Sequence, residues 1–270
     1  MRRRCKHIAT LLLLLLLVYV PSSRGAPSQL PVFLYFNPDS IHNNLSGLKE
    51  AMDSFLSTSG FAFSFQPFAR FHDFDREARS ESSAFLFMPE WYLHQDGNDK
   101  RFKPFLIPVR QGMTTYRKVL LVAADSALTT EKLSDTTIAM TPVGKVGLAV
   151  LDEAIFKRIG LRGKDLNFIT TAKDSDALFA LALRQVQAAL VSQDNLVHVG
   201  NINPRLLKTV KILAVSEPIS LPLLCYVKGA VPGEEVERMR KLLLAGKEGG
   251  KAAHVMEMLQ IDAWRIPNAE

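Results

Sequence analysis

Histidine, glycine and acidic residues, which often carry enzyme chemistry, are poorly spaced for it in this sequence. The six histidines stand at positions 7, 42, 72, 94, 198 and 254, and no two have the i, i+4 spacing of a helical metal-ligand pair. Gly144 and Gly147 lack the other glycines of a dinucleotide- or phosphate-binding loop. Acidic residues between His72 and Glu81 alternate with arginines, which is typical of a solvated segment. The sequence therefore predicts no catalytic residue, no metal site and no cofactor, and indicates that the protein is not an enzyme.

Aromatic residues are the side chains that could instead contact a small ligand. Aromatic rings supply apolar area with a few polar tips, and most small-molecule pockets are lined in this way. Five aromatic residues lie at or near the ends of predicted strands: Tyr35, Phe36, Trp91, Tyr92 and Tyr116. Each of them could equally be a core residue, so we treat them as candidates for the wall of a ligand pocket.

These candidates must be positioned by strands and helices that alternate along the chain. Apolar runs and period-two alternation predict strands at residues 31–36, 61–65, 84–88, 116–124, 137–140, 168–170, 211–215 and 221–227. Helical spacing predicts helices at residues 45–55, 177–190, 234–244 and 251–259. Thr141 as an N-cap and Pro142 at the first helical position predict a further helix, which ends at Gly160. This rhythm favours an α/β fold with parallel sheets under helices.

The predicted elements divide the chain into two similar α/β portions. The second portion lies inside the first, because the elements after residue 220 are too few to form a domain alone. We therefore expect lobe 1 to comprise residues 26–115 and 221–270, and lobe 2 to comprise residues 116–220. The chain would cross between the lobes near residues 116–124 and 216–221.

The first 25 residues have the pattern of a secretory signal peptide. Residues 1–7 are basic, residues 8–20 are an uninterrupted apolar run, and small and polar residues follow up to Gly25. The apolar run would form roughly 20 Å of helix, short of the roughly 30 Å hydrocarbon core of a bilayer, so a permanent membrane anchor is the weaker alternative. We expect cleavage after Gly25 and a mature periplasmic protein that starts at Ala26.

Removing this segment changes the charge and the cysteine content. Five of the 33 basic residues lie in the first 25 residues and none of the 27 acidic ones does, which leaves 28 basic residues against 27 acidic ones. A net charge of +1 does not support binding to nucleic acid. Cys5 is lost with the signal, so Cys225 remains alone in an apolar run, where we expect a buried strand residue and no internal disulfide.

The order of elements resembles that of type 2 periplasmic solute-binding proteins, and local motifs resemble the group that binds phosphate, phosphite and phosphonate for ABC transporters. The resembling segments are the strand 85–88 followed by Pro89-x-x-Tyr92, the strand 116–122 followed by Asp125-Ser126, Leu133-Ser134-Asp135, the crossing at 215–219, and Val231-Pro232. The resemblance implies two lobes, each a mostly parallel sheet flanked by helices, joined by two crossing strands. It also implies a ligand held in the cleft, a hinge motion on binding and delivery to an inner-membrane permease. We expect a monomer.

The residues that hold phosphonate in that family are not retained in this sequence. The family's Ser-Thr-Ser-Gly stretch falls on Gly144-Lys145-Val146-Gly147, its histidine falls on Asp174, and its following acid falls on Gln187. Lys145 could restore one positive charge, whereas Asp174 would repel a dianion or serve as a helix cap. The resemblance therefore leaves Thr141, Lys145 and Asp174, with the five aromatic residues, as candidate ligand contacts, and it does not imply tight phosphonate binding.

Three hypotheses for function remain open from the sequence. The first is a periplasmic receptor that captures a small ligand of unknown identity for a transporter. The second is a carrier of a lipid or another hydrophobic molecule between membranes, suggested by the lost hydroxyls and the remaining aromatic residues. The third is a ligand-sensing adaptor for a membrane sensor protein.

Overall fold

The structure is a computed structural model that describes residues 30–40, 44–80, 83–246 and 250–267. The predicted signal peptide and its cleavage site lie outside the described residues. In the part of the chain that the structure describes, no helix is long and apolar enough to cross a membrane.

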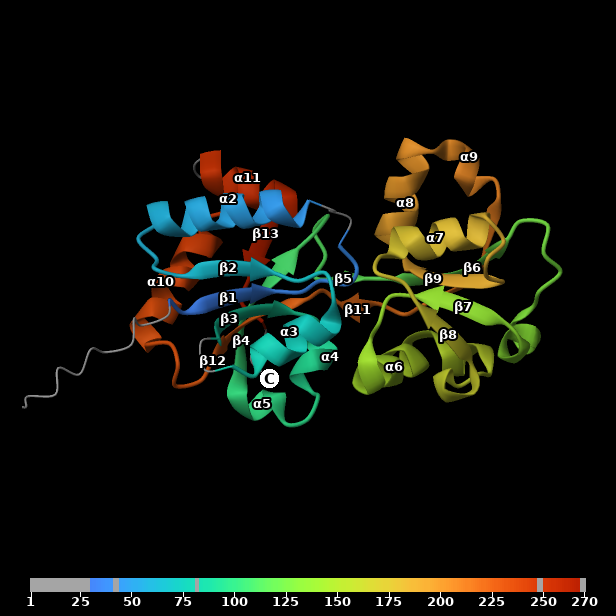
Figure 1. Ribbon diagram of the computed structural model, residues 1–270, viewed down its shortest axis with the longest axis horizontal. Coiled ribbons are helices and arrows are strands. Elements are labelled where there is room, and N and C mark those ends of the chain that lie inside the picture. The colour runs from blue at the N-terminus through green and yellow to red at the C-terminus, as the bar shows by residue number, and fades with distance from the viewer. Residues whose placement is uncertain (1–29, 41–43, 81–82, 247–249, 268–270) are drawn as a thin grey trace, which may run out of the picture.

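Lobe 1 is built on a six-stranded sheet with the order β13-β4-β12-β3-β1-β2 (Figure 1). Its strands are β1 (Val32–Tyr35), β2 (Ser64–Pro67), β3 (Ser83–Met88), β4 (Phe102–Val109), β12 (Leu223–Val227) and β13 (Ala263–Arg265). Its helices are α2 (Leu45–Thr58), α3 (Phe71–Ala78), α4 (Glu90–Leu93), α5 (Asn98–Arg101), α10 (Gly233–Leu244) and α11 (Gly250–Leu259). Helices α2, α10 and α11 cover one face of the sheet, and α3 and α4 cover the other.

Alternation along β1 explains why this sheet has a core on both faces. Phe33 and Tyr35 belong to the apolar cluster under α2 and α11, whereas Leu34 and Phe36 belong to the cluster under α3 and α4. Successive side chains of a strand point to opposite faces, so an unbroken apolar run supplies both clusters. Burial of each such side chain stabilises the fold by roughly 1.5–3 kcal/mol.

Lobe 2 contains a separate five-stranded sheet with the order β10-β6-β9-β7-β8. Its strands are β6 (Lys118–Ala123), β7 (Thr137–Met140), β8 (Asn167–Thr170), β9 (Ala188–Ser192) and β10 (Val210–Val215). Its helices are α6 (Gly144–Leu151), α7 (Asp174–Ala182), α8 (Gln193–Ile202) and α9 (Pro204–Leu207), with short turns η1 (Thr130–Asp135), η2 (Asp152–Phe156), η3 (Lys157–Ile159) and η4 (Gly163–Asp165).

Two chain crossings join the lobes. Strands β5 (Thr115–Tyr116) and β11 (Ile219–Ser220) pair antiparallel and lie between the two large sheets (Figure 1). The two-lobed α/β fold is thereby confirmed. The sheets are mixed and not mostly parallel as expected, because among the described strands only β1–β2, β1–β3, β7–β8 and β7–β9 pair in parallel. The domain boundaries stay a prediction, which the position of the β5–β11 pair supports.

Lobe 2 departs from the sequence prediction at two helices. Thr141 does not cap α6, which starts at Gly144, because Gly144 has φ +62° and Val143 stands at the cap. The helix predicted to reach residue 190 ends at Ala182. Arg184 then turns the chain with φ +60°, and residues 188–192 form the buried strand β9 instead. Strand β4 and helix α8 were not predicted from the sequence.

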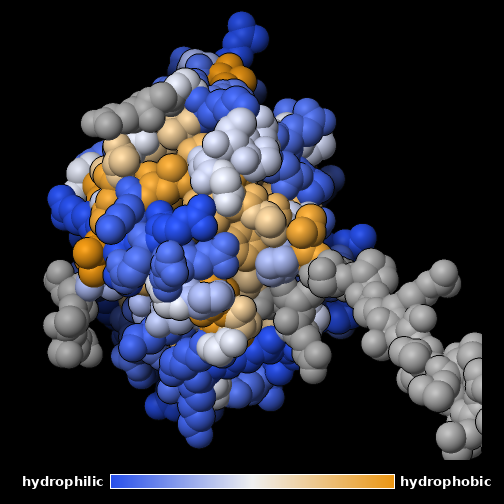
Figure 2. Space-filling view, turned by 90° about the vertical axis from the view of Figure 1, so that its left-hand side faces the viewer, coloured by the Kyte–Doolittle hydropathy of each residue, from blue (hydrophilic) through white to orange (hydrophobic). Residues whose placement is uncertain are grey.

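The end of lobe 1 that is remote from lobe 2 has a mixed surface. Figure 2 shows apolar areas there among hydrophilic ones. Scattered exposed apolar side chains are normal on soluble proteins and need no functional explanation.

Cys225 provides a direct test of this fold, because it lies in β12 inside the lobe 1 sheet with 0% of its surface exposed. Burial, and then the charge of Glu90, raise the pKa of its thiol. We expect the protein that starts at Ala26 to show no reaction with a thiol reagent when native and one reactive thiol in guanidinium chloride. A Val197→Cys control, at a position that is 53% exposed, should react in the native state. Rapid native labelling of Cys225 would contradict this sheet order.

Candidate functional site

The carboxyl ends of parallel strands from both sheets lie at the space between the lobes. Asp39 follows β1 and Trp91 follows β3 in lobe 1, while Thr141, Asp174 and Ser192 lie at or beyond the ends of β7, β8 and β9 in lobe 2. Strands β1 and β7 point toward each other across the hinge pair in Figure 1. Ligands of open α/β sheets bind outside the carboxyl ends of the strands, so this is the candidate site.

A buried lysine joins two carboxylates at the centre of the site. The Lys118 ammonium contacts Oδ1 of Asp39 and lies 3.2 Å from Oδ1 of Asp174. The exposed fractions of the three side chains are 2% for Lys118, 13% for Asp39 and 0% for Asp174. Asp39 belongs to lobe 1, whereas Lys118 and Asp174 belong to lobe 2. The ion pair between Lys118 and Asp39 therefore spans the cleft.

Neutral donors fix both carboxylates. The Ser192 backbone N–H donates to Oδ2 of Asp174 at 2.5 Å, and the Tyr116 hydroxyl donates to Oδ2 of Asp39 at 2.6 Å. The Asn195 amide donates to the Asp39 carbonyl at 3.1 Å and so adds a second contact between the lobes.

A further ion pair crosses the cleft away from this centre. Nη1 of Arg110, which precedes the hinge in the chain, lies 3.1 Å from Oδ2 of Asp194 on α8. The two side chains are 15% and 29% exposed. Because exposed pairs contribute at most about 1 kcal/mol, this partly exposed pair adds little to lobe closure.

Burial and charge together set the protonation of the central groups. Burial alone lowers the pKa of Lys118, but the charges of Asp174 and Asp39 raise it more, so the ammonium stays charged. Burial raises the pKa of Asp174, and the charge of Lys118 opposes that rise. Burial, followed by the charge of Asp39, raises the pKa of Tyr116 well above its usual value, so the phenol keeps the proton that it donates. One cation is thus shared by two carboxylates.

The start of α6 packs against lobe 1 through Trp91. A Cβ at Gly147 would lie 3.2 Å from the Trp91 ring and 2.7 Å from Cβ of Val143, so this position requires glycine. Val146 and Val150 pack on the same lobe 1 cluster as Trp91. The first turn of this helix is therefore lined by an indole and apolar side chains.

A pocket opens beside the hinge next to the central lysine. Asp39, Trp91, Tyr116, Val150 and Ile219 are among its lining residues, so both lobes and the hinge contribute. Its volume is about 320 Å³. This volume is within the range of small-molecule pockets.

The structure brings three of the eight candidate residues from the sequence together and places the other five elsewhere. Tyr116, Asp174 and Trp91 lie together around the cleft, as described above. Thr141 is 0% exposed and its hydroxyl has no hydrogen-bond partner. Lys145 is exposed on the first turn of α6.

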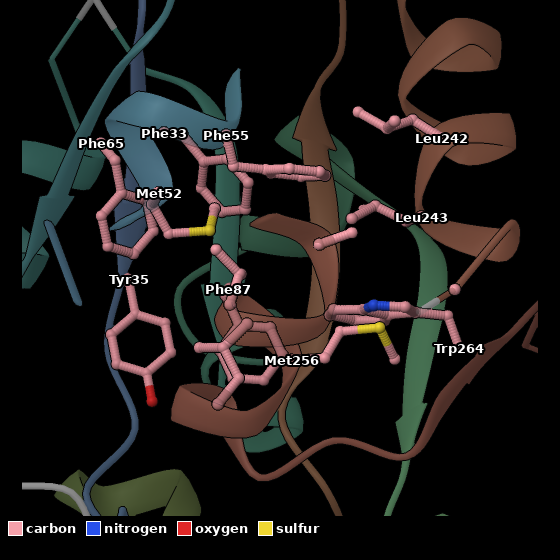
Figure 3. A pocket seen from close by; sticks show the side chains of 14 residues that line it. Phe33, Tyr35, Met52, Phe55, Phe65, Phe87, Leu242, Leu243, Met256 and Trp264 are labelled. Carbon is pink, nitrogen blue, oxygen red and sulfur yellow. The ribbon is translucent and has the colours of Figure 1, made fainter. Parts of the chain in front are cut away.

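Three of the candidate aromatic residues lie in the core of lobe 1. Phe36 stacks on Phe74, and the Tyr92 hydroxyl donates to Asp75 at 2.8 Å. Tyr35 lines an apolar cavity between the sheet and helices α2, α10 and α11 (Figure 3). The ring of Tyr35 thus packs in the core, and burial raises the pKa of its hydroxyl more than Ser40 and Asn37, in the turn that carries Asp39, lower it.

Sequence reasoning missed Asp39, Lys118 and Asn195. Lys118 had a usable signal, because it is the one charged residue in the apolar strand 118–123. Asp39 had only the turn Asn37-Pro38-Asp39 after β1, which does not reveal a partner 79 positions away. Among the described residues, no group of three or more His, Cys, Asp or Glu could hold a metal ion.

Comparison with known proteins identifies the fold and the family. The family model described as the periplasmic substrate-binding protein of a phosphonate ABC transporter matches residues 31–270. A search of curated proteins finds no match.

Three solved structures illustrate the similarity. A binding-protein component of an ABC phosphonate transporter from Pseudomonas aeruginosa has a TM-score of 0.71 at 14% identity, over 88% of this chain and 82% of that one. PhnD1 from Prochlorococcus marinus, in complex with methylphosphonate, has a TM-score of 0.70 at 9% identity, over 88% and 93%. A Xanthomonas citri protein bound to chloride has a TM-score of 0.69 at 12% identity, over 88% and 92%. At these identities, the likeness to each structure shows the fold alone.

Replacing the central lysine tests the charge balance of the site. Lys118→Met leaves two buried carboxylates without a cation, which should lower the free energy of unfolding by about 3–5 kcal/mol at pH 7.5 in urea titrations. Because burial already raises the pKa of Asp174 in the folded protein, the variant should take up a proton on folding as the pH falls. The loss in free energy of unfolding relative to the wild type should therefore become smaller as the pH falls toward 5.

An exposed lysine of the same lobe, Lys132, provides the matched control. Lys132→Met should change stability by less than about 0.5 kcal/mol at either pH. A Lys118→Met deficit below about 1 kcal/mol, or one that does not vary with pH, would contradict the buried charge cluster.

Proposed function

Because this chain belongs to the family of periplasmic phosphonate-binding components of ABC transporters, we propose that it captures a small ligand between its two lobes and presents it to an inner-membrane permease. Proteins of this family are periplasmic, bind small ligands and work with membrane permeases. The observation that carries the proposal is the charged and hydrogen-bonding cluster of Asp39, Tyr116, Lys118 and Asp174, which draws on both lobes at the carboxyl ends of their strands.

The hinge supports capture by closure of the lobes. In the described part of the chain, only the short pair of β5 and β11 connects the two sheets, so the lobes can rotate about it. Side chains from both lobes would then meet around a ligand, as Trp91 of lobe 1 and Val150 of lobe 2 do around the hinge pocket.

The proposal excludes tight binding of phosphate or simple phosphonates. Gly144, Lys145 and Val146 offer no hydroxyl donors at the first turn of α6, and Trp91 packs against this turn. Losing about three charge-assisted hydrogen bonds costs roughly 5–9 kcal/mol, which removes most micromolar affinity. Asp174, buried beside Lys118, adds repulsion for a dianion.

Transport of a hydrophobic molecule, the second hypothesis from the sequence, would need an apolar cavity large enough for that molecule. The cavity of Figure 3 is lined by apolar and aromatic side chains from the sheet, α2, α10 and α11. The indole nitrogen of Trp264, which borders it, is buried and has no hydrogen-bond partner. The volume of this cavity is about 20 Å³, room for about one water molecule, so the structure does not favour the hydrophobic-carrier function.

Ligand identification separates these functions. We expect mass spectrometry of the natively purified mature protein to find a small water-soluble molecule. After its removal, adding it back should shift the emission of Trp91 in a Trp264→Phe protein, because Trp91 borders the hinge pocket and is one of two tryptophans in the sequence. Methylphosphonate should give no calorimetric heat at micromolar concentrations.

The outcomes are distinct. Micromolar binding of methylphosphonate would contradict the loss of the phosphonate site. A co-purified lipid that leaves Trp91 emission unchanged would support the hydrophobic-carrier function and contradict capture in the cleft.

A further inference from the structure

The carboxylate of Asp39 lies in a binding arrangement that does not depend on the rest of lobe 1. Lys118 contacts its Oδ1, and the Tyr116 hydroxyl donates to its Oδ2 at 2.6 Å. We propose that Lys118 and Tyr116 form a site for the carboxylate of a small monoanionic ligand, and that Asp39 occupies this site when the lobes close without a ligand. The inference rests on the proposed capture in the cleft and names the class of ligand.

The two donors are held in place from outside lobe 1. Asp174 lies 3.2 Å from the Lys118 ammonium and is itself fixed by the Ser192 backbone N–H at 2.5 Å. Tyr116 lies on hinge strand β5. Asp39 is therefore the member of the cluster that leaves when the hinge opens, and Lys118 and Tyr116 then face the cleft as a preformed pair of donors.

Charge selects a monoanion for this site. Lys118 and Asp174 together are neutral, so a monocarboxylate reproduces the net charge that Asp39 gives the cluster. A dianionic phosphonate would add a second negative charge within a few ångströms of buried Asp174, where like charges repel strongly. A carboxylate also presents two oxygens in one plane, as Asp39 does to Lys118 and Tyr116.

The hinge pocket indicates the rest of the ligand. Asp39 and Tyr116 line this pocket together with the apolar side chains of Trp91, Val150 and Ile219, and the lining also includes Glu90, His94 and Ser220. A ligand whose carboxylate replaces that of Asp39 would place its body against these side chains. The geometry therefore points to an organic monocarboxylate with an apolar or aromatic body.

Chemical rescue tests the site, because acetate is the fragment that Asp39→Ala removes. Acetate should raise the thermal unfolding midpoint of Asp39→Ala by about 3–5 °C at tenfold saturation, with a saturable dose response. The wild type should not respond, and sodium chloride at equal concentration should leave the variant unchanged. Asp39→Ala/Lys118→Met should lose the response to acetate.

A surface ion pair supplies the matched control. Asp125 pairs with Arg184 at 2.7 Å, and both side chains are more than half exposed. Asp125→Ala should show no rescue by acetate. An equal response of Asp125→Ala, of the wild type or of the double variant would overturn the proposal, and an equal response to chloride would overturn its carboxylate class.

A near-isosteric variant decides the question if Asp39→Ala does not fold. Asp39→Asn removes the charge that competes with a ligand carboxylate. Phenylacetate should therefore bind this variant roughly tenfold more tightly than the wild type. Both proteins carry Trp264→Phe, so that Trp91 emission reports binding. Equal affinities, or no binding to either protein, would overturn the carboxylate site. If the co-purified ligand still shifts Trp91 emission in that case, capture in the cleft survives; if it does not, both proposals fail.

Discussion

The structure depends on one buried cation, Lys118, which must be neutralised from both sides of the cleft. Moving a charge out of water costs several kcal/mol unless partners compensate for it. The charge of Lys118 is compensated by Asp174 from lobe 2 and by Asp39 from lobe 1. The Ser192 N–H donates to the second carboxylate oxygen of Asp174, and the Tyr116 hydroxyl donates to that of Asp39. This requirement links the position of the lobes to the charge of a single side chain.

The topology places these groups without any unusual local structure. Parallel strands of both sheets end at the cleft, so the residues that follow β1 and β8 face each other. The hinge pair of β5 and β11 lies beside them and contributes Tyr116. The fold of this family binds anions in the cleft between the lobes. In this chain, the cleft contains the carboxylate of Asp39.

Much of the fold was predictable because its signals are local. The apolar runs of β1, β3 and β6 and the helices α2, α10 and α11 follow from periodicity. Strand β4 was missed because Pro104 and Pro108 weaken its pattern, and β9 was merged with α7 because alanine and leucine suit both structures. The site was less predictable: Phe36, Trp91 and Tyr92 are all aromatic residues near strand ends and pack in one cluster of lobe 1, and only the structure shows that Trp91 alone of the three also borders the hinge pocket. The contact between Asp39 and Lys118 depends on lobe closure, which no local pattern contains.

The interlobe distance in solution tests the central claim most directly. Spin labels at Glu50→Cys on α2 and Arg205→Cys on α9, both exposed, report the separation of the lobes, because buried Cys225 remains unlabelled. The distance distribution of the labelled wild type should be narrow, and Asp39→Ala should broaden it and shift it to longer distances. An unchanged distribution in Asp39→Ala would contradict the claim that the contact between Asp39 and Lys118 holds the lobes together.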